Sequence, residues 1–239
     1  MRIRLPLSRT LFFACAFLFA LVALLPLRLA LDWFALDGRG FAAREAKGSI
    51  WLGSVSEAQF GTVALGDLSA QLRTLPLFLG RARVDLERVD EADRFKGSAT
   101  VSRHSFGIDD MTARLDVGST LAPLPIGAVD MSDVTAHFAD GLCTSAEGLV
   151  KANVAGDIAG VTLPGGLSGN ARCDQGALLL PLVSQSGMEA LNLRLFEDGR
   201  YQVELAVRPV DDAMRDRLIQ SGFALGNNNS YALRVSGTF

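Results

Sequence analysis

Hydrophobic and polar residues alternate in several stretches of the chain beyond residue 48. Apolar side chains take every second position of each stretch, and mostly polar or charged residues lie between them. A segment of this kind has one buried and one solvated face, which is typical of strands in antiparallel sheets. The alternating apolar positions are Leu68, Ala70 and Leu72; Ala82, Val84 and Leu86; Met111, Ala113, Leu115 and Val117; and Val134, Ala136 and Phe138. The pattern predicts a mainly β fold with an antiparallel sheet.

The C-terminal part of the chain predicts a hairpin. Apolar residues alternate over residues 191–195 and again over 201–207. Asp198 and Gly199 lie between the two runs, and both residue types tolerate the positive φ angles of a tight hairpin turn. A last alternating run over residues 231–235 predicts one more strand.

One short helix is predicted between these last strands. Residues 209–212 read Pro-Val-Asp-Asp, which suits a helix start, and Met214 and Leu218 are four residues apart on one helix face. Gly222 is a stop signal. An alternative interpretation makes the aspartates of this segment metal ligands, but the positive end of a helix explains acidic residues there without a metal. We expect no metal site.

The first part of the chain contains an uncharged apolar run. Residues 10–27 would extend about 27 Å as a helix, close to the hydrocarbon thickness of a bilayer. Three arginines precede the run, and the positive-inside rule then leaves the N-terminus in the cytoplasm. We expect a cytoplasmic tail over 1–9, a transmembrane helix over 10–31, and Trp33 at the outer membrane interface.

A cleaved signal peptide is the alternative interpretation of this run. The apolar region of a signal peptide covers 7–15 residues and ends at a site with small residues. The run here is longer, and the sequence after it, LPLRLALDWF, offers no good Ala-x-Ala site. We therefore favour an uncleaved anchor.

The remaining residues, 32–239, show no long linker and no break in composition. They predict one all-β domain on the far side of the membrane. Two stretches rich in proline and glycine, at 122–127 and 161–169, suit loops between hairpins. Two halves of this domain would meet near residues 118–127.

Composition and charge exclude several classes of protein. The chain has 239 residues, of which 49% are hydrophobic and 21% charged, and this excludes a disordered chain. Its first 31 residues hold four arginines and no acid, so the remaining chain carries 19 basic and 26 acidic residues. Because an acidic surface is repelled by phosphates, we expect no binding to nucleic acid.

Candidate catalytic residues are few. The two histidines, His104 and His137, lie in or beside predicted strands. Ser105 is adjacent to His104, but neighbouring strand residues point to opposite faces, so the two side chains would not meet. No nucleophile elbow, zinc-protease motif or phosphate-binding loop is present in the sequence. We expect neither enzymatic activity nor a cofactor.

The cysteines predict a disulfide. Cys15 lies in the apolar N-terminal run, whereas Cys143 and Cys173 are the two cysteines of the part expected in an oxidising compartment. An even count in such a compartment favours a bridge between them. Two unrelated buried thiols are the alternative.

Three sequence elements, taken in order, resemble a known family. The N-terminal run leads into LPLRLALDWFAL; the segment AKGSIWLGSV (46–55) is followed by ALGDLSAQLRTLPLFLGRARVDL (64–86); and LCTSAEGLVKANVAG and LSGNARCDQGALLLPL contain the two cysteines. Together they resemble protein N of the bacterial type II secretion system. The sequence pattern is also similar to that of AsmA-like proteins, whose long curved sheets have an apolar inner face.

The resemblance implies a single-pass protein of the bacterial inner membrane with most of its chain in the periplasm. It would be a non-catalytic accessory or scaffold component of an apparatus that exports folded periplasmic proteins. Its implied partners are other inner-membrane subunits of that apparatus, and its sheet would be curved. A groove that binds or moves lipid or another apolar ligand is the alternative function.

An apolar segment beside a tryptophan provides the candidate contact residues. Gly48 and Gly53 bracket Trp51, so the chain can turn on both sides of a large aromatic side chain. Leu77 and Phe78 belong to the apolar run LPLFLG. Ordinary core residues are one interpretation; a patch on the membrane surface or against a membrane-proximal partner is the other.

The inner face of the sheet distinguishes the two candidate functions. An open apolar trough along residues 68–86 and 191–207 would favour transport of a ligand. A filled core would favour a scaffold. A third possibility, a periplasmic hydrolase, would need a second group of reactive residues near one of the histidines.

Overall fold

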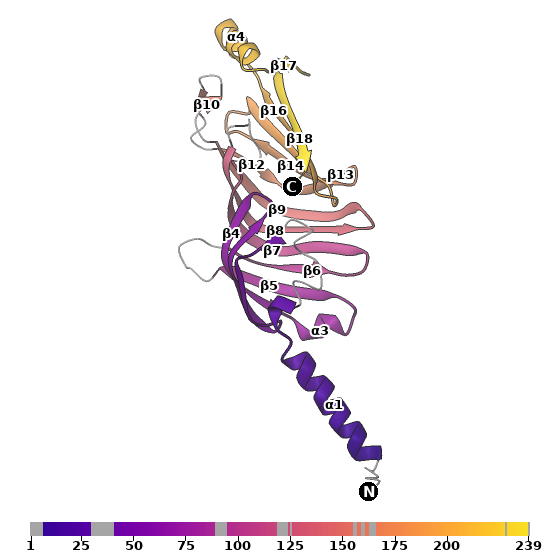
Figure 1. The fold of residues 1–239 in the computed structure, drawn as a ribbon. Helices are drawn as coiled ribbons and strands as arrows, with labels where there is room; N and C mark the ends of the chain where they lie inside the picture. Colours follow the sequence, from indigo (N-terminus) through magenta and orange to yellow (C-terminus); the bar gives the residue numbers. More distant parts are fainter. Residues whose placement is uncertain are drawn as a thin grey trace.

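The structure is a computed structural model that describes residues 7–29, 41–88, 95–118, 124, 126–154, 157–158, 161–162, 166–227 and 229–238. Most of its strands form one antiparallel sheet, confirming the mainly β fold (Figure 1). These strands are β1 (Phe41–Ala42), β2 (Glu45–Ser49), β3 (Leu52–Phe60), β4 (Val63–Leu72), β5 (Ala82–Arg88), β6 (Lys96–Val101), β7 (Ser105–Asp116), β8 (Ile126–Ala139), β9 (Leu142–Val154), β12 (Leu167–Asn170), β13 (Arg172–Asp174), β14 (Ala177–Val183), β15 (Glu189–Leu195), β16 (Arg200–Val207), β17 (Ala224–Leu225) and β18 (Tyr231–Thr238). The short strands β10 (Asp157–Ile158) and β11 (Val161–Thr162) form a separate ribbon.

The sheet follows the chain order from one edge to the other. Its hydrogen-bonded path runs β1-β3-β4-β5-β6-β7-β8-β9-β12-β14-β15-β16-β18-β17, while β2 pairs with β3 and β13 pairs with β14. Among the described strands β1 and β17 end this path and are not paired with each other, so the sheet is open. It curves along its length (Figure 1).

A row of irregular backbone positions bends the sheet across three neighbouring strands. Asp110 in β7, Asp133 in β8 and Gly148 in β9 have φ angles of 51°, 50° and 108°, and the β7–β8 and β8–β9 registers shift close to them. We call these three residues the crease. Extra residues of this kind bend a strand and increase its twist. The crease therefore lets long strands curve around their own apolar face.

Side chains stabilise the two strained aspartates of the crease. The Asp110 N–H donates to Thr135 Oγ1 at 3.1 Å, and the Asp133 N–H donates to Thr112 Oγ1 at 3.2 Å. Each threonine lies on the strand opposite the aspartate it contacts. Because positive φ is costly for residues other than glycine, such local bonds help to hold the conformation.

The apolar positions of most alternating runs form the core, as predicted, whereas Ala82, Val84 and Leu86 of β5 are only half-buried. Leu68, Met111, Val134, Leu191 and Val203 are all at most 6% exposed, and their polar neighbours in sequence face outward. One cluster of buried side chains continues from β3 to the segment after the C-terminal helix. The inner face of the curved sheet is therefore filled by its own side chains.

The predicted C-terminal helix is α4 (Asp212–Gln220), and a side-chain cap stabilises its first turn. The side chain of Asp211 accepts a hydrogen bond from the Met214 N–H at 2.6 Å, which is the usual role of an N-cap residue. Met214 and Leu218 are buried at 3% and 0% exposure. Gly222 follows the helix with a φ of 88°.

The predicted hairpin is formed by β15 and β16, and it turns at Asp198 and Gly199. The backbone N–H of Arg200 and then its guanidinium donate to the Asp198 carboxylate, at 3.1 and 2.6 Å, and they lower the pKa of Asp198. A carboxylate with a lowered folded pKa stabilises the fold above its unfolded pKa. This contribution is lost as the pH falls through the folded pKa.

The N-terminal helix differs from the predicted transmembrane helix over residues 10–31. Helix α1 covers Leu7–Ala23, 17 residues, and it ends just before Leu25 and Pro26. Proline cannot donate a backbone hydrogen bond, and it disfavours helical geometry in the residue before it. Within the described residues, none of the helices combines the length and apolar character needed to cross a bilayer.

The geometry of the crease predicts that no residue other than glycine is tolerated at position 148. A Cβ added there would lie 2.5 Å from the Asp133 carbonyl oxygen and 2.5 Å from Val134 Cα, both backbone atoms. We expect Gly148→Ala to lower the free energy of unfolding by roughly 3 kcal/mol or to prevent folding. Denaturant unfolding of the full chain in detergent measures the change.

Gly118→Ala is the matched control, because the nearest atom to an added Cβ there is 3.5 Å away. It should leave the stability within about 1 kcal/mol of the starting protein. Equal stability of the two variants would contradict the role of Gly148 in the crease.

Candidate functional site

The end of α1 is attached to the sheet by a tight turn over residues 48–53, which we call the corner. The Trp51 Nε1–H donates to the carbonyl oxygen of Val22 at 3.1 Å. The Ile50 N–H donates to the carbonyl oxygen of Leu25 at 3.1 Å. The last carbonyls of a helix have no partners within it, and here the Val22 carbonyl oxygen accepts from Trp51 and also, at 3.4 Å, from the Leu25 N–H beyond the helix.

Two glycines allow the corner to approach the helix end. Gly48 has a φ of 82°, and a Cβ on it would lie 2.4 Å from the Leu52 carbonyl oxygen. A Cβ on Gly53 would lie 2.5 Å from the Cδ2 atom of Leu27. Leu27 is only 8% exposed, so it packs into the corner and holds the chain after α1 against the sheet.

An exposed apolar loop lies next to the corner. The short helix α3 (Thr74–Leu77) and the residues that follow it to Arg81 form this loop, which we call the α3 loop. The Leu72 N–H donates to the Ile50 carbonyl oxygen at 3.1 Å, so the loop begins at the corner itself. Leu75, Phe78 and Leu79 are 79%, 87% and 79% exposed.

The four predicted contact residues differ in their surroundings. Trp51 is half-buried and holds α1, while Leu77 and Phe78 lie in the α3 loop at 38% and 87% exposure. Trp33 lies outside the described residues. The structure adds Leu52, 67% exposed at the corner, which the sequence analysis did not single out although it lies within the GSIWLG element.

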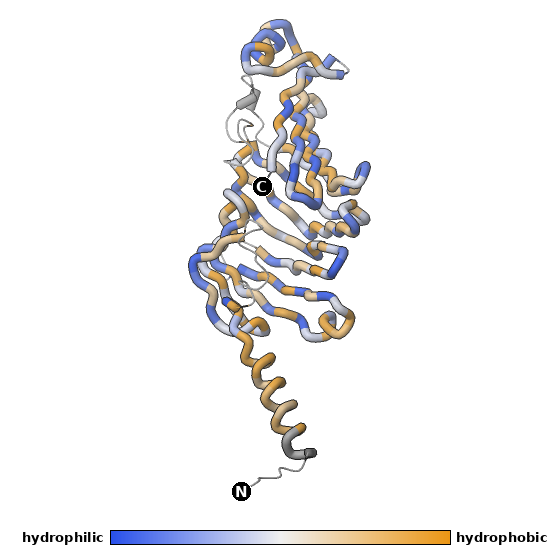
Figure 2. Tube along the Cα trace, turned by 45° about the vertical axis from the view of Figure 1, so that its right-hand side comes forward, coloured by the Kyte–Doolittle hydropathy of each residue, from blue (hydrophilic) through white to orange (hydrophobic). Residues whose placement is uncertain are grey.

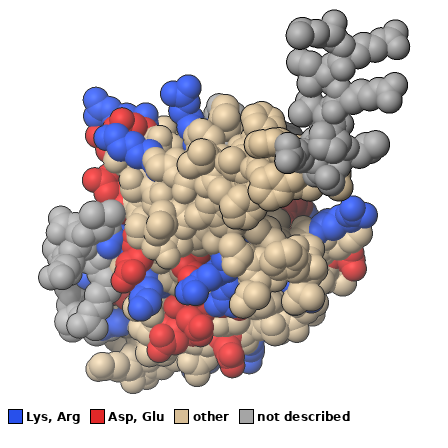
Figure 3. All heavy atoms as spheres, turned by 90° about the horizontal axis from the view of Figure 1, so that it is seen from below, with Lys and Arg blue, Asp and Glu red and all other residues tan. Residues whose placement is uncertain are grey.

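The corner, the α3 loop and α1 lie at the same end of the molecule, opposite α4 (Figure 1). Figure 2 shows apolar colour along α1 and again on the α3 loop. Viewed from this end, an area without charged side chains occupies the upper middle of the face, and charged side chains lie below it and on both sides (Figure 3). This end therefore has the chemistry of a contact surface for an apolar environment.

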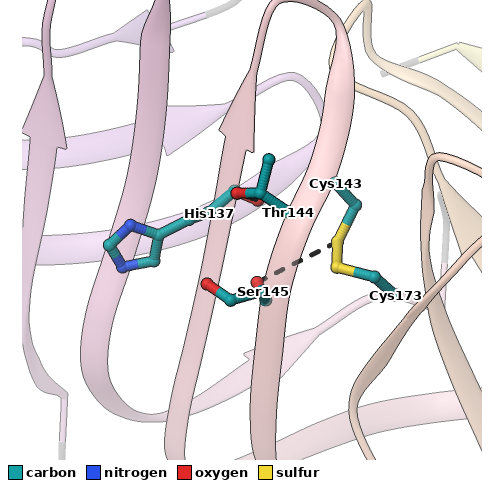
Figure 4. Close-up of a disulfide and its surroundings, with 5 residues drawn as sticks. All are labelled: His137, Cys143, Thr144, Ser145 and Cys173. Atoms are coloured by element: carbon teal, nitrogen blue, oxygen red, sulfur yellow. Dashed lines mark hydrogen bonds between the residues drawn. A yellow bond between two sulfur atoms is a disulfide. The ribbon is translucent and has the colours of Figure 1, made fainter.

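The predicted disulfide between Cys143 and Cys173 is present in the structure, with the Cα atoms 5.5 Å apart (Figure 4). Cys143 lies at the start of β9, and Cys173 lies in β13. The Cys143 N–H also donates to the Gly176 carbonyl oxygen at 2.8 Å. The bridge therefore fastens the β13–β14 hairpin to β9, where the first part of the sheet meets the second.

The sulfur of Cys143 makes one further contact, 4.0 Å from the carbonyl oxygen of Ser145 (Figure 4). A disulfide sulfur carries no hydrogen, so this is packing and not a hydrogen bond. His137 is drawn in the same view, and its carbonyl oxygen accepts from Thr144 Oγ1 at 3.1 Å. Its ring points away from the disulfide.

His137 has a charged neighbour but no nucleophile. Its Nε2 atom lies 2.7 Å from Asp109 Oδ1 on the adjacent strand β7, and Arg83 lies 3.6 Å from the other oxygen of Asp109. Within the described part of the chain the ring makes no hydrogen bond to a hydroxyl or thiol. A hydrolase of the serine or cysteine type needs that contact, so this pair has the geometry of a surface ion-pair group.

The serines around the other histidine bond to each other. Ser102 Oγ and Ser105 Oγ are 2.6 Å apart, and the Ser105 N–H also donates to Ser102 Oγ. The His104 carbonyl oxygen accepts from the Asp140 N–H. These contacts close a turn between β6 and β7 and assemble no catalytic group.

The described strands also form one polar hollow on the outer face of the sheet. It encloses about 590 Å³. Two ion pairs lie on its walls, Arg194 with Asp174 and Arg234 with Glu204, each with a closest approach of 2.6 Å. Such a hollow does not suit an apolar ligand.

Sequence comparisons with known proteins find a family and a curated relative. The model of the family described as "Type II secretion system (T2SS), protein N" matches residues 39–234. The curated "Type II secretion system protein N" of Vibrio cholerae serotype O1 (strain ATCC 39315 / El Tor Inaba N16961) is 25% identical over 214 residues, covering 83% of this chain and 84% of that protein. No solved structure matches the chain.

The disulfide predicts a measurable loss of stability when it is removed. The cysteines are 30 residues apart, a loop whose closure is worth about 3.5 kcal/mol in the chain-entropy account. We expect the double variant Cys143→Ser, Cys173→Ser to fold but to melt roughly 10 °C lower. Thermal unfolding without reductant tests this.

Cys15→Ser is the control, since Cys15 lies in α1 and is not bridged. It should melt with the starting protein. Labelling of both Cys143 and Cys173 as free thiols, in protein isolated without reductant, would contradict the bridge.

Proposed function

The chain belongs to the type II secretion system protein N family, and on this basis we propose that it is a non-catalytic scaffold of that secretion apparatus in the bacterial inner membrane. It supports export of folded periplasmic proteins and contacts other inner-membrane subunits of the apparatus. The observation that carries the proposal is the corner, because a scaffold must hold its membrane anchor and its periplasmic sheet in one fixed geometry.

Helix α1 is the described part of the proposed anchor. Its residues from 11 to 23 are apolar, and five large side chains among them are 64–75% exposed, namely Phe12, Phe13, Phe17, Leu18 and Phe19. Exposed aromatic and leucine side chains on a helix favour a lipid environment. Arg2 and Arg4 precede α1 and Arg9 lies in its first turn, and these three arginines favour a cytoplasmic N-terminus, with the sheet in the periplasm.

The state of the inner face favours the scaffold over the lipid-binding groove. Leu68 and Leu191 are each 1% exposed, and Val207 is fully buried. Leu68, Leu191 and Val207 belong to one cluster of buried side chains, which favours a filled inner face. The described hollow is on the opposite, polar face.

The membrane topology gives the first test. A reporter enzyme that is active only in the periplasm, fused after Phe239, should be active, and the purified chain should keep its original N-terminus. The chain should fractionate with inner membranes. A mature protein that begins near residue 32 would refute the anchor.

A secretion assay in cells that depend on this protein gives the second test. Gly53→Val should reduce secretion to the level of cells lacking the protein, because the added side chain displaces Leu27 from the corner. His104→Ala and His137→Ala should secrete normally, since neither residue belongs to a catalytic group. Protein levels are compared by immunoblot.

Loss of secretion by either histidine variant at normal protein level would support an enzyme instead. Normal secretion by Gly53→Val would show that the fixed attachment of α1 is not required.

A further inference from the structure

We propose that the α3 loop is a second membrane contact, which inserts into the headgroup region of the bilayer on the side where the sheet lies. This rests on the proposed function, because it takes α1 as the anchor. The loop would add a second point of membrane attachment beside α1. The partner is the lipid surface itself.

The loop presents apolar side chains that nothing in the described structure covers. Leu75, Phe78 and Leu79 are each about four-fifths exposed, and Leu52 at the corner is 67% exposed. A soluble surface tolerates scattered apolar side chains, but four large ones at one end form a patch. Residues 74–80 contain no charged side chain.

The backbone of the loop is suited to a medium poor in water. The N–H groups of Phe78, Leu79 and Gly80 donate to the carbonyl oxygens of Leu75, Pro76 and Leu77, at 3.3, 3.0 and 3.0 Å. The Arg81 N–H also donates to the Pro76 carbonyl oxygen at 3.0 Å. Since unpaired backbone groups are costly in lipid, this internal bonding favours insertion of the tip.

The charges beside the loop suit an interface. Arg73 precedes the loop and pairs with Asp85 of β5, while Arg81 ends the loop and is exposed. Arginines flanking an apolar tip place guanidinium groups at the level of lipid phosphates. The insertion would therefore be shallow, with the leucine and phenylalanine side chains below the headgroups.

Hydrogen bonds hold the start of the α3 loop close to the end of α1. The Leu25 carbonyl oxygen accepts from the Ile50 N–H, and the Ile50 carbonyl oxygen accepts from the Leu72 N–H. Only Arg73 separates Leu72 from the start of α3. The point where the chain leaves α1 and the point where the α3 loop begins are thus joined through one residue, which places both near the same membrane surface.

An environment-sensitive fluorophore on single cysteines of the full chain tests the inference. The chain is reconstituted into liposomes of phosphatidylethanolamine and phosphatidylglycerol, without and with lipids that carry a nitroxide quencher. Three samples are compared: Phe78→Cys in a Cys15→Ser background, Val210→Cys in the same background, and the native chain labelled at Cys15. Cys143 and Cys173 are bridged and do not react.

Val210 is the matched control, because it is an apolar residue with 71% exposure beside α4, at the opposite end of the molecule. We expect the label at residue 78 to shift its emission to shorter wavelength and to be quenched by a nitroxide near the headgroups. The label at residue 15 should be quenched by a nitroxide deep in the acyl chains. The label at residue 210 should respond to neither.

The outcomes separate the two proposals. If residue 15 is quenched and residue 78 behaves like residue 210, the anchor is supported and the second contact is overturned. If residue 15 is not quenched, the proposed anchor fails. Quenching of residue 210 as strongly as residue 78 would indicate general adsorption to lipid and would also overturn the second contact.

Discussion

The crease across β7, β8 and β9 is the constraint on which the rest of the structure depends. An open sheet of this size has one apolar face, and a flat sheet would leave that face in water. Positive φ angles at Asp110, Asp133 and Gly148 bend the long strands, so the sheet packs against itself without closing into a ring. The filled inner face and the free ends of the sheet both follow from this bend.

The bend also determines where contacts with other molecules can form. The end that carries α1 has the most exposed large apolar side chains, although Val210, Ile219 and Leu225 in or near α4 are also 51–71% exposed. At the end with α1, the corner attaches this exposed helix to the sheet. The Trp51 Nε1–H donates a hydrogen bond to the Val22 carbonyl oxygen, and Leu27 packs against Gly53. The disulfide stabilises a second junction of the fold, where β13 and β14 lie against β9.

Local patterns in the sequence predicted most of the individual elements. Alternation located core positions of β4, β7, β8, β15 and β16. The sequence also predicted the start of α4, its buried residues Met214 and Leu218, and its end just before Gly222. The crease was not predicted, because two of its residues are aspartates whose positive φ depends on threonines of neighbouring strands. The end of α1 was placed too late because the apolar character of the run obscured the effect of Pro26.

The surroundings of the candidate contact residues were likewise predictable from the sequence only in part. The exposure of Phe78 depends on tertiary structure, since the same apolar run would be core if another strand covered it. Trp51 has a role that its sequence context did not predict: the residue is half-buried, and its indole N–H donates to the end of α1. A tryptophan suits this position because its large apolar ring fills the corner while its one donor satisfies a carbonyl at the helix end. Phenylalanine would retain an apolar ring at the corner but would lose the donor to the Val22 carbonyl oxygen.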